Sequence, residues 1–529
     1  MSKFSAFLIY LLFSQCVNAI GKDQPENENN ATKFNLIEST ISQAHAALKN
    51  QTTNCVSLVK GYLKRIDTYD QSTKLNAIIL INSNGLNRAK QLDKQFIVDK
   101  KLLPLHCIPV ILKDNFDTAD MPTEAGAFAL KGSIPPDDAF MVKRLRDAGA
   151  IIIAKSNMGE FAFSPYKTIS STHGETRNAY DLTRDPAGSS GGTASAIAAN
   201  FGIIGMGTDT GNSIRGPASH LGLVGMRSTI GLTSRDGIVP LLINRDIAGP
   251  LTRTVEDAAK TFNVIAGFDK ADPITHNKQS QLKVDYTQFL KKDGLKGVRL
   301  GVLRSTFDTK KTDPEIKALM KQAIKDLTDA GAIIVDPFAI KNLYKLRKAT
   351  GFCSRFRYDL NNYLTSLGNK APIKKFQEIY DKHLFSNKSG IAIKWALGVT
   401  VPPHEQKQPC VDVEGDKRRK NLLVAVMEAM DVNKVDAIIY PTWSNPPRKL
   451  GDIHSPSGNN SPLISPHTGQ PSITVPMGYT KNNALPAGLQ FLARPFDDAL
   501  LFQYAYAYEQ KTLHRKAPAL FPKIPVNFE

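Results

Sequence analysis

Hydrophobic and polar residues follow two patterns along this chain: short apolar runs and longer stretches with helical spacing. The apolar runs predict buried strands at residues 75–81, 107–112, 150–154, 201–206, 298–303, 332–335, 435–440 and 472–476. Helical spacing predicts helices over residues 58–66, 86–92, 138–148 and 498–510, and small residues predict a tightly packed helix at 193–200.

Strands that alternate with helices are typical of an α/β fold. We expect a single large domain with a mixed, largely parallel twisted β-sheet covered by helices on both faces. No Ser/Gly/Pro-rich linker or internal repeat divides the 529 residues, and an apolar content of 42% is ample for a large core. Residues 340–420 interrupt the alternation, because they are helical but irregular, and predict an insertion.

The N-terminus has the pattern of a secretory signal peptide. Lys3 precedes a mostly apolar segment at residues 4–13, and residues 17–19 fit a small-residue cleavage site. We expect a signal peptide at residues 1–19, a disordered polar leader at 20–34 and the main domain at 35–525. The apolar segment is too short for a stable membrane span. These features predict a secreted or periplasmic protein, whereas an apolar core helix is the alternative.

The formal net charge is +18, with lysines spread throughout the chain. The densest basic run, at residues 417–420, has no interleaved aromatic residues. Such a run is more typical of a solvated helix face than of a nucleic-acid patch. We therefore expect no nucleic-acid partner.

Removal of the signal peptide would leave four cysteines: Cys55, Cys107, Cys353 and Cys410. They could form two disulfides by three alternative pairings, or remain free buried thiols, and their spacing is unlike that of a metal site. In a eukaryotic secretory pathway, Asn-x-Ser/Thr sites would also matter; they begin at Asn30, Asn50, Asn387 and Asn459. The sequence decides neither the pairing nor the glycosylation.

Residues 185–217 contain the strongest candidate chemistry. A Gly-Ser-Ser-Gly-Gly run occupies residues 188–192, and a Gly-rich turn, Gly-Thr-Asp-Thr-Gly-Asn-Ser-Ile-Arg, occupies residues 207–215. Glycine permits backbone angles that turn successive N–H groups toward a ligand. A cluster of backbone N–H groups of this kind, called a nest, can stabilise an oxyanion. The predicted helix and strand between the two motifs would bring Ser189 and Ser213 together.

These motifs resemble those of the amidase signature family, serine hydrolases that cleave amide C–N bonds. The resemblance covers residues 35–515 and includes Ile-Pro-Val-Ile-Leu-Lys-Asp-Asn at 108–115, the segment that begins at Gly222 and Leu-Pro-Ala-Gly-Leu-Gln-Phe at 485–491. It implies the amidase signature fold, with the insertion near the active-site mouth. It also implies hydrolysis of a carboxylic acid amide to the acid and ammonia or an amine, without a metal or organic cofactor.

The resemblance implies a nucleophile at Ser213, a bridging Ser189 in a cis peptide and a neutral Lys113 as base. Lysine has an ordinary pKa of about 10.4, which burial lowers, and Lys113 ends an apolar strand. The expected oxyanion hole is formed by the backbone N–H groups of Thr210, Gly211, Asn212 and Ser213. Supporting roles fall to Ser190, beside Lys113, and to Asp209 and Arg215, which would fix the loop.

Two positions depart from the usual family pattern, which has Gly at both. Asn212 tolerates positive φ better than most residues, so we expect the hole to be kept. Cys107 lies close to Lys113 and raises the alternative of a thiol nucleophile. We favour a small buried core residue, whose replacement by Ala would lower stability by about 1 kcal/mol.

Three other motifs compete with this assignment. His220 is the nearest histidine to Ser213 and could serve as base, although a structural role is favoured. Ser190 fits the G-x-S-x-G nucleophile elbow, but the polar residues 180–186 do not form the buried strand that an elbow follows. Ser57 and Lys60 fit S-x-x-K, a pattern that occurs by chance in most chains of this length.

The sequence therefore predicts an amidase that acts on a small-molecule or peptide amide as a monomer or homodimer. One alternative is a glutaminyl-tRNA amidotransferase A-type subunit, which the export signal disfavours because charged tRNA is cytoplasmic. The other is a non-catalytic binding protein of the same fold. The substrate stays open among aliphatic, aryl, peptide C-terminal and fatty acid amides.

Overall fold

The computed structural model describes residues 34–481 and 484–524. The predicted signal peptide and all but the last residue of the predicted leader lie outside the described residues. Within this range, no helix combines the length and the apolar composition that crossing a membrane requires.

The centre of the molecule is an eleven-stranded mixed sheet in the order β1-β3-β2-β6-β8-β7-β12-β13-β11-β9-β10. Its strands are β1 (Ile78–Ile81), β2 (Pro109–Lys113), β3 (Ile151–Ser156), β6 (Ile204–Asp209), β7 (Val224–Arg227), β8 (Ile247–Thr252), β9 (Arg299–Val302), β10 (Ile333–Val335), β11 (Ala437–Pro441), β12 (Ser472–Tyr479) and β13 (Pro486–Leu492). A separate two-stranded sheet pairs β4 (Ile169–Ser170) with β5 (Gly174–Glu175).

Parallel pairing occurs in two groups of strands. One group is β3, β2 and β6, and the other is β10, β9 and β11. Antiparallel pairs through β8, β7, β12 and β13 join the two groups. This arrangement confirms a single large α/β domain with a mixed sheet. It also places β2 directly beside β6, which is the pairing that builds the candidate site.

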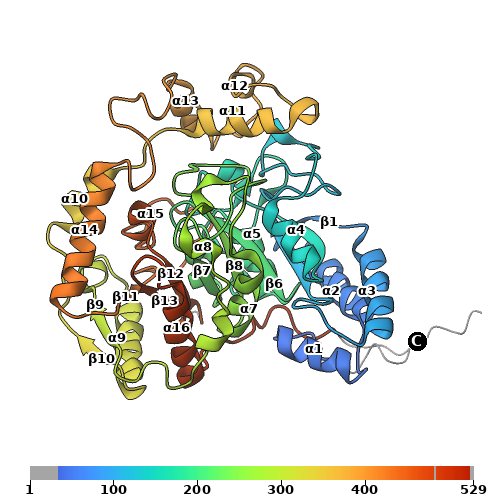
Figure 1. Cartoon of the computed structure of the whole chain (residues 1–529), viewed down its shortest axis with the longest axis horizontal. Helices are drawn as coiled ribbons and strands as arrows, with labels where there is room; N and C mark the ends of the chain where they lie inside the picture. Colours follow the sequence, from blue (N-terminus) through green and yellow to red (C-terminus); the bar gives the residue numbers. More distant parts are fainter. Residues whose placement is uncertain (1–33, 482–483, 525–529) are drawn as a thin grey trace, which may run out of the picture.

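Sixteen helices surround the sheet in the described part of the chain (Figure 1). Those wholly or mostly outside the predicted insertion are α1 (Ile41–Lys49), α2 (Cys55–Tyr69), α3 (Gly85–Asp99), α4 (Phe140–Asp147), α5 (Gly191–Ala198), α6 (Arg215–His220), α7 (Val255–Ile265), α8 (Lys278–Gln281), α9 (Pro314–Asp329), α14 (Lys417–Val432), α15 (Ser465–Thr468) and α16 (Asp498–Thr512). The apolar stripes predicted for α2 and α3 face the core, because Leu58, Tyr62 and Leu92 are buried.

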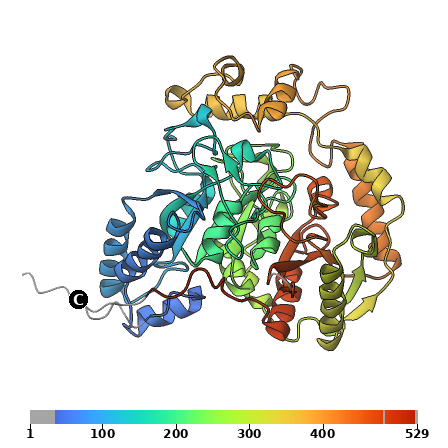
Figure 2. The same cartoon turned by 180° about the vertical axis from the view of Figure 1, so that it is seen from behind.

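The predicted insertion contains α10 (Leu343–Thr350), α11 (Phe356–Ser366), α12 (Gln377–Asp381) and α13 (Gly390–Leu397). In both views α11, α12 and α13 lie together across one end of the molecule (Figures 1 and 2), and we call these three helices and their connections the cap. An apolar cluster joins the cap to the main body, in which Phe356 packs against Phe376 of the cap and against Phe161 of the main body.

Two disulfides decide the pairing that the sequence left open: Cys55–Cys107 and Cys353–Cys410. The first joins the start of α2 to Cys107, two residues before β2, and removes the free-thiol alternative for Cys107. The second links the segment before the cap to the segment after it.

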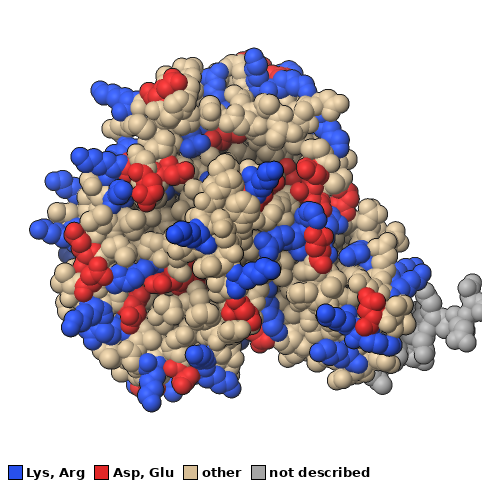
Figure 3. All heavy atoms as spheres, in the orientation of Figure 1, with Lys and Arg blue, Asp and Glu red and all other residues tan. Residues whose placement is uncertain are grey.

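Lys and Arg side chains are scattered among Asp and Glu on the face seen in Figure 3. The basic run at residues 417–420 differs from its predicted role as a solvated helix face in one respect. Arg419 is fully buried, and its guanidinium donates to the backbone oxygens of His467, Pro466, Asn244 and Val411. This arginine therefore holds backbone segments together in the interior.

Candidate active site

The glycines of the Gly-Ser-Ser-Gly-Gly run pack too closely against neighbouring atoms to be replaced by residues with a side chain. A Cβ at Gly188 would lie 2.3 Å from the Lys167 carbonyl oxygen, and one at Gly192 would lie 2.1 Å from the Asn157 carbonyl oxygen. A non-proline cis peptide joins Gly188 to Ser189, and α5 begins two residues later. Close packing on these glycines fixes Ser189 in the interior, where it is fully buried.

Lys113 is the last residue of β2, and its side chain is fully buried. Its Nζ donates to Ser189 Oγ at 2.8 Å and to Thr208 Oγ1 at 2.7 Å. Burial lowers the pKa of Lys113 to about 7, although the carboxylates of Asp246 and Asp209 oppose the shift. A lysine with this pKa is substantially neutral near pH 7 and can accept a proton.

Thr208 is a site residue that the sequence prediction missed. Its hydroxyl accepts hydrogen bonds from Lys113 and from Asn115 Nδ2, the latter at 3.1 Å. Ser190 holds the backbone of Thr208 on both sides, because its Oγ donates to Thr208 O at 3.2 Å and accepts from Thr208 N at 3.3 Å. Ser190 thus supports Lys113 through Thr208 rather than by direct contact.

Asp209 and Arg215 hold the loop that carries Ser213. Arg215 Nε lies 3.0 Å from Asp209 Oδ2, and Arg227 Nη1 lies 3.1 Å from Asp209 Oδ1, with all three side chains fully buried. Burial alone would raise the pKa of Asp209, but the two guanidinium groups outweigh it and lower that pKa to about 2. Arg215 also donates to Gly211 O at 2.7 Å, so the ion pair reaches the loop backbone.

Asp246 is a second residue that the sequence did not reveal. Its Oδ1 accepts from Thr210 Oγ1 at 2.5 Å, and its Oδ2 accepts the backbone N–H groups of Leu241 and Leu242. Asp246 therefore anchors the start of the loop at 210–213 to the segment before β8. Nothing near Asp246 in the sequence indicates this role, because the contact spans 36 residues.

Asn212 joins the two serine-bearing loops. Its Nδ2 donates to Gly188 O at 2.9 Å and to Pro165 O at 3.1 Å, and the side chain is buried. Asn212 is not among the described residues with positive φ, so tolerance of a left-handed backbone is not what this position requires. The side chain in place of the usual Gly makes a contact that Gly lacks.

The loop at residues 210–213 has donors available for a ligand. Within the described part of the chain, no atom accepts a hydrogen bond from the backbone N–H of Gly211, Asn212 or Ser213. Ser213 is 5% exposed and lies two residues before α6. Backbone N–H groups beside a hydroxyl are the arrangement that stabilises a developing oxyanion during acyl transfer.

The competing motifs have structural roles. The ring of His220 packs on Trp443 with centroids 4.5 Å apart, and burial lowers its pKa to about 3. The Ser190 hydroxyl forms hydrogen bonds with the Thr208 backbone. Ser57 and Lys60 lie on α2, where Lys60 is exposed. None of these residues shares the hydrogen bonds that join Lys113 to Ser189.

Comparison with known proteins agrees with this geometry. The Amidase family model matches residues 57–502. A glutamyl-tRNA(Gln) amidotransferase A-type subunit of Thermoanaerobacter pseudethanolicus is 33% identical over 506 residues, which cover 91% of this chain and 98% of the relative. A probable amidase of Arabidopsis thaliana is 30% identical over 534 residues, which cover 97% of this chain and 98% of the relative.

Two solved structures have similar folds. The native peptide amidase of Stenotrophomonas maltophilia matches with a TM-score of 0.80 and 33% identity, over 92% of this chain and 99% of the other. An amidase family protein of Bacillus anthracis matches with a TM-score of 0.79 and 32% identity, over 94% and 95%. The family match, the relatives and the fold agree, and we conclude that this chain belongs to the amidase signature family.

Proposed function

We propose that this chain hydrolyses a carboxylic acid amide through an acyl-enzyme on Ser213, with Ser189 and Lys113 as the proton relay. The observation that carries the proposal is the 2.8 Å hydrogen bond from the buried Lys113 Nζ to Ser189 Oγ. A serine hydroxyl needs a base to become a nucleophile, and a buried, largely neutral lysine supplies one without a histidine.

The reaction runs in two halves. Ser213 Oγ attacks the amide carbonyl while its proton passes to Ser189, whose own proton passes to Lys113. The carbonyl oxygen becomes negative and is stabilised by the backbone N–H groups of residues 210–213. The relay then returns a proton to the leaving nitrogen, so ammonia or an amine departs. Water repeats the same steps on the acyl-enzyme and releases the acid.

The names of the relatives support an amide substrate but do not fix its class. They include a peptide amidase and a probable amidase. We therefore propose a small-molecule or peptide amide as the substrate.

An amidotransferase A-type subunit is a second candidate function. It is favoured by the relatives that are named as A-type subunits of glutamyl-tRNA(Gln) amidotransferase, one of them 33% identical over 91% of this chain. Such a protein would co-purify with a partner and release ammonia from glutamine. The purified chain alone, assayed with glutamine and with a panel of simple amides, discriminates the two functions.

We also propose that the protein is secreted or periplasmic. Two disulfides support this location, because disulfides persist mainly in oxidising compartments. Asn50 and Asn387 are exposed, so these two Asn-x-Ser/Thr sites are accessible in the folded chain.

Three variants test the relay. Ser213→Ala should abolish labelling by a serine-reactive fluorophosphonate and reduce turnover to background. Ser189→Ala and Lys113→Ala should each slow labelling by orders of magnitude, and the double variant should be little worse than either, because residues that act as one unit are strongly non-additive. His220→Ala serves as the control and should have a much smaller effect. Loss of labelling in His220→Ala with near-normal turnover in Lys113→Ala would overturn the assignment.

A further inference from the structure

Phe352 lies against the loop that forms the candidate oxyanion hole. A Cβ added to Gly211 would be 3.5 Å from Cζ of the Phe352 ring. Phe352 is nonetheless 39% exposed, and Gly211 is half-buried rather than buried. Phe352 and Gly211 are therefore adjacent, and solvent reaches both of them.

Three side chains hold the ring in this place. The Arg245 and Arg347 guanidinium carbons lie 4.7 and 5.5 Å from its centroid, within the range of cation–π contact. The His467 ring meets it edge-on at 5.0 Å between centroids. Because these neighbours come from different parts of the chain, the position of Phe352 is set by the fold and not by its own segment alone.

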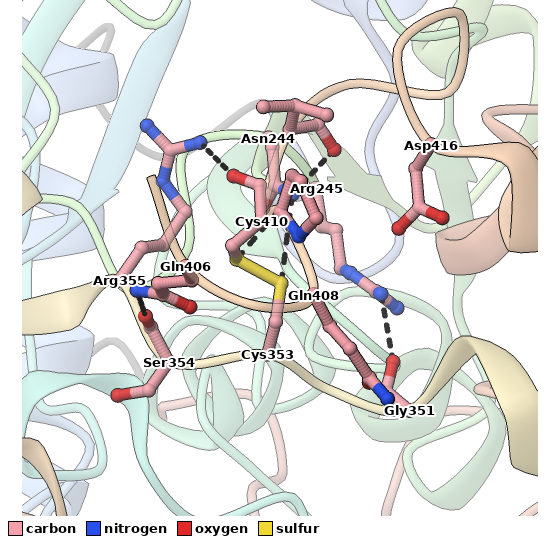
Figure 4. Close-up of a disulfide and its surroundings, with 12 residues drawn as sticks. Asn244, Arg245, Gly351, Cys353, Ser354, Arg355, Gln406, Gln408, Cys410 and Asp416 are labelled. Atoms are coloured by element: carbon pink, nitrogen blue, oxygen red, sulfur yellow. Dashed lines mark hydrogen bonds between the residues drawn. A yellow bond between two sulfur atoms is a disulfide. The ribbon is translucent and has the colours of Figure 1, made fainter. Parts of the chain in front are cut away.

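Arg245 also fixes the backbone of the residue before Phe352. It is fully buried, and its Nη2 donates to Gly351 O at 2.7 Å (Figure 4). Gly351 has a φ of +48°, a backbone conformation that glycine adopts without strain. The turn that presents Phe352 thus depends on a contact to the main body.

The residue after Phe352 is Cys353, whose disulfide to Cys410 links the two segments that flank the cap. Asn244, the neighbour of Arg245, donates through Nδ2 to Val411 O at 2.9 Å and lies 3.9 and 3.8 Å from the two sulfurs (Figure 4). Arg355 adds a hydrogen bond to Cys410 O at 2.8 Å. The two segments that flank the cap in the sequence therefore both contact residues 244–245 of the main body.

From these contacts we infer that Phe352 is a specificity-determining residue, whose ring forms one wall of the substrate site. This wall favours substrates with a flat apolar group beside the scissile carbonyl. The Cys353–Cys410 disulfide keeps the Phe352 ring in this position. The inference rests on the proposed function of Ser213. Stacked or edge-on aromatic contacts add to apolar burial, so an aryl group that reaches the ring gains affinity over a small alkyl group. The disulfide matters because it removes freedom from the segment next to the ring.

Two fluorophosphonates with the same leaving group test the wall, because they report on Ser213 without a known substrate. One carries a phenyl group on phosphorus and the other an ethyl group. Phe352→Ala should lower the labelling rate with the phenyl probe by roughly tenfold relative to the ethyl probe, and Phe352→Leu should give an intermediate ratio. Phe268→Ala replaces another half-exposed phenylalanine and should leave the ratio unchanged.

The outcomes separate the inference from the function on which it rests. An unlabelled wild-type chain would contradict the proposed function. A labelled wild type whose phenyl-to-ethyl ratio does not change in Phe352→Ala would overturn the inference. Equal slowing with both probes is one form of that result, and it indicates general damage to the site.

The disulfide has its own matched pair of variants. Cys353→Ser with Cys410→Ser should lower the phenyl-to-ethyl ratio in the same direction as Phe352→Ala. The control, Cys55→Ser with Cys107→Ser, removes the other disulfide and should lower thermal stability without changing the ratio. If both pairs leave the ratio unchanged, the disulfide does not position the wall.

Discussion

Lys113 sets the pH dependence that the proposed relay should show. Its pKa is lowered to about 7 by burial, and only the neutral amine accepts a proton. The neutral fraction rises with pH through that value, so kcat/KM should rise through about pH 7 and stay high at alkaline pH. His220, whose pKa is lowered to about 3, is neutral throughout this range and should add no limb.

The measurement is a profile of kcat/KM from about pH 5 to about pH 10. In Lys113→Ala the ascending limb should disappear or move, whereas in His220→Ala it should stay in place. An unchanged limb in Lys113→Ala would assign the titration to another group.

Asn212 offers a second prediction for a single residue. Its side-chain amide ties the Ser213 loop to Gly188 O, next to the bridging serine. Asn212→Gly restores the usual family residue but removes this bond, so kcat should fall about threefold to tenfold with KM less affected, as one hydrogen bond contributes about 1 kcal/mol. Asn212→Asp should be worse, because a carboxylate cannot donate and places negative charge beside the oxyanion. Wild-type kcat in Asn212→Gly would show that the bond does not position the relay.

Among the secondary-structure elements, the entry to β2 depends on the Cys55–Cys107 disulfide. Cys107 has a φ of +63°, which explains why Gly is usual at this position, and its sulfur is tied to the start of α2. Cys107→Ala should therefore lower the free energy of unfolding by about 2–4 kcal/mol, more than expected for a free thiol, while most turnover is kept.

The matched control for this prediction is Cys55→Ala, which breaks the same bond from its other end. Both variants should lose similar stability, and the double variant should lose little more, as expected for partners in one interaction. Denaturant unfolding measures the stability. A loss of turnover in Cys107→Ala that Cys55→Ala does not share would assign Cys107 a chemical role.

The strands that the sequence predicted are those with short apolar runs. Those runs identified β1–β3, β6 and β9–β12, with boundaries displaced by up to three residues; β6, for example, extends to Asp209 through residues that we assigned to a turn. The strands β7, β8 and β13, each of which contains Gly or Pro, were not assigned. Burial in the sheet, which local sequence does not show, makes them strands.

The residues of the candidate site likewise fall into two groups, those that the sequence predicted and those that it did not. Lys113, Ser189 and Ser213 lie in motifs that can be recognised in the sequence, and the structure brings Lys113 and Ser189 into contact. Three other hydrogen bonds join segments that are far apart in the chain: Lys113 to Thr208, Thr210 to Asp246, and Asn212 to Gly188. Such contacts depend on tertiary packing and have no local signal.

For the molecule as a whole, the cysteines give a direct test of oxidation and processing together. The chain has five cysteines, and four of them pair in the structure. The fifth, Cys16, lies in the predicted signal peptide. Protein isolated from its native host and denatured without reductant should therefore expose no free thiol to a thiol reagent, and should expose four after reduction. One free thiol before reduction would indicate that Cys16 is retained, and four or five would indicate a chain kept in a reducing compartment.

N-terminal sequencing of the same sample should begin near Ile20. An intact Met1 with free thiols would contradict export and would favour the amidotransferase alternative.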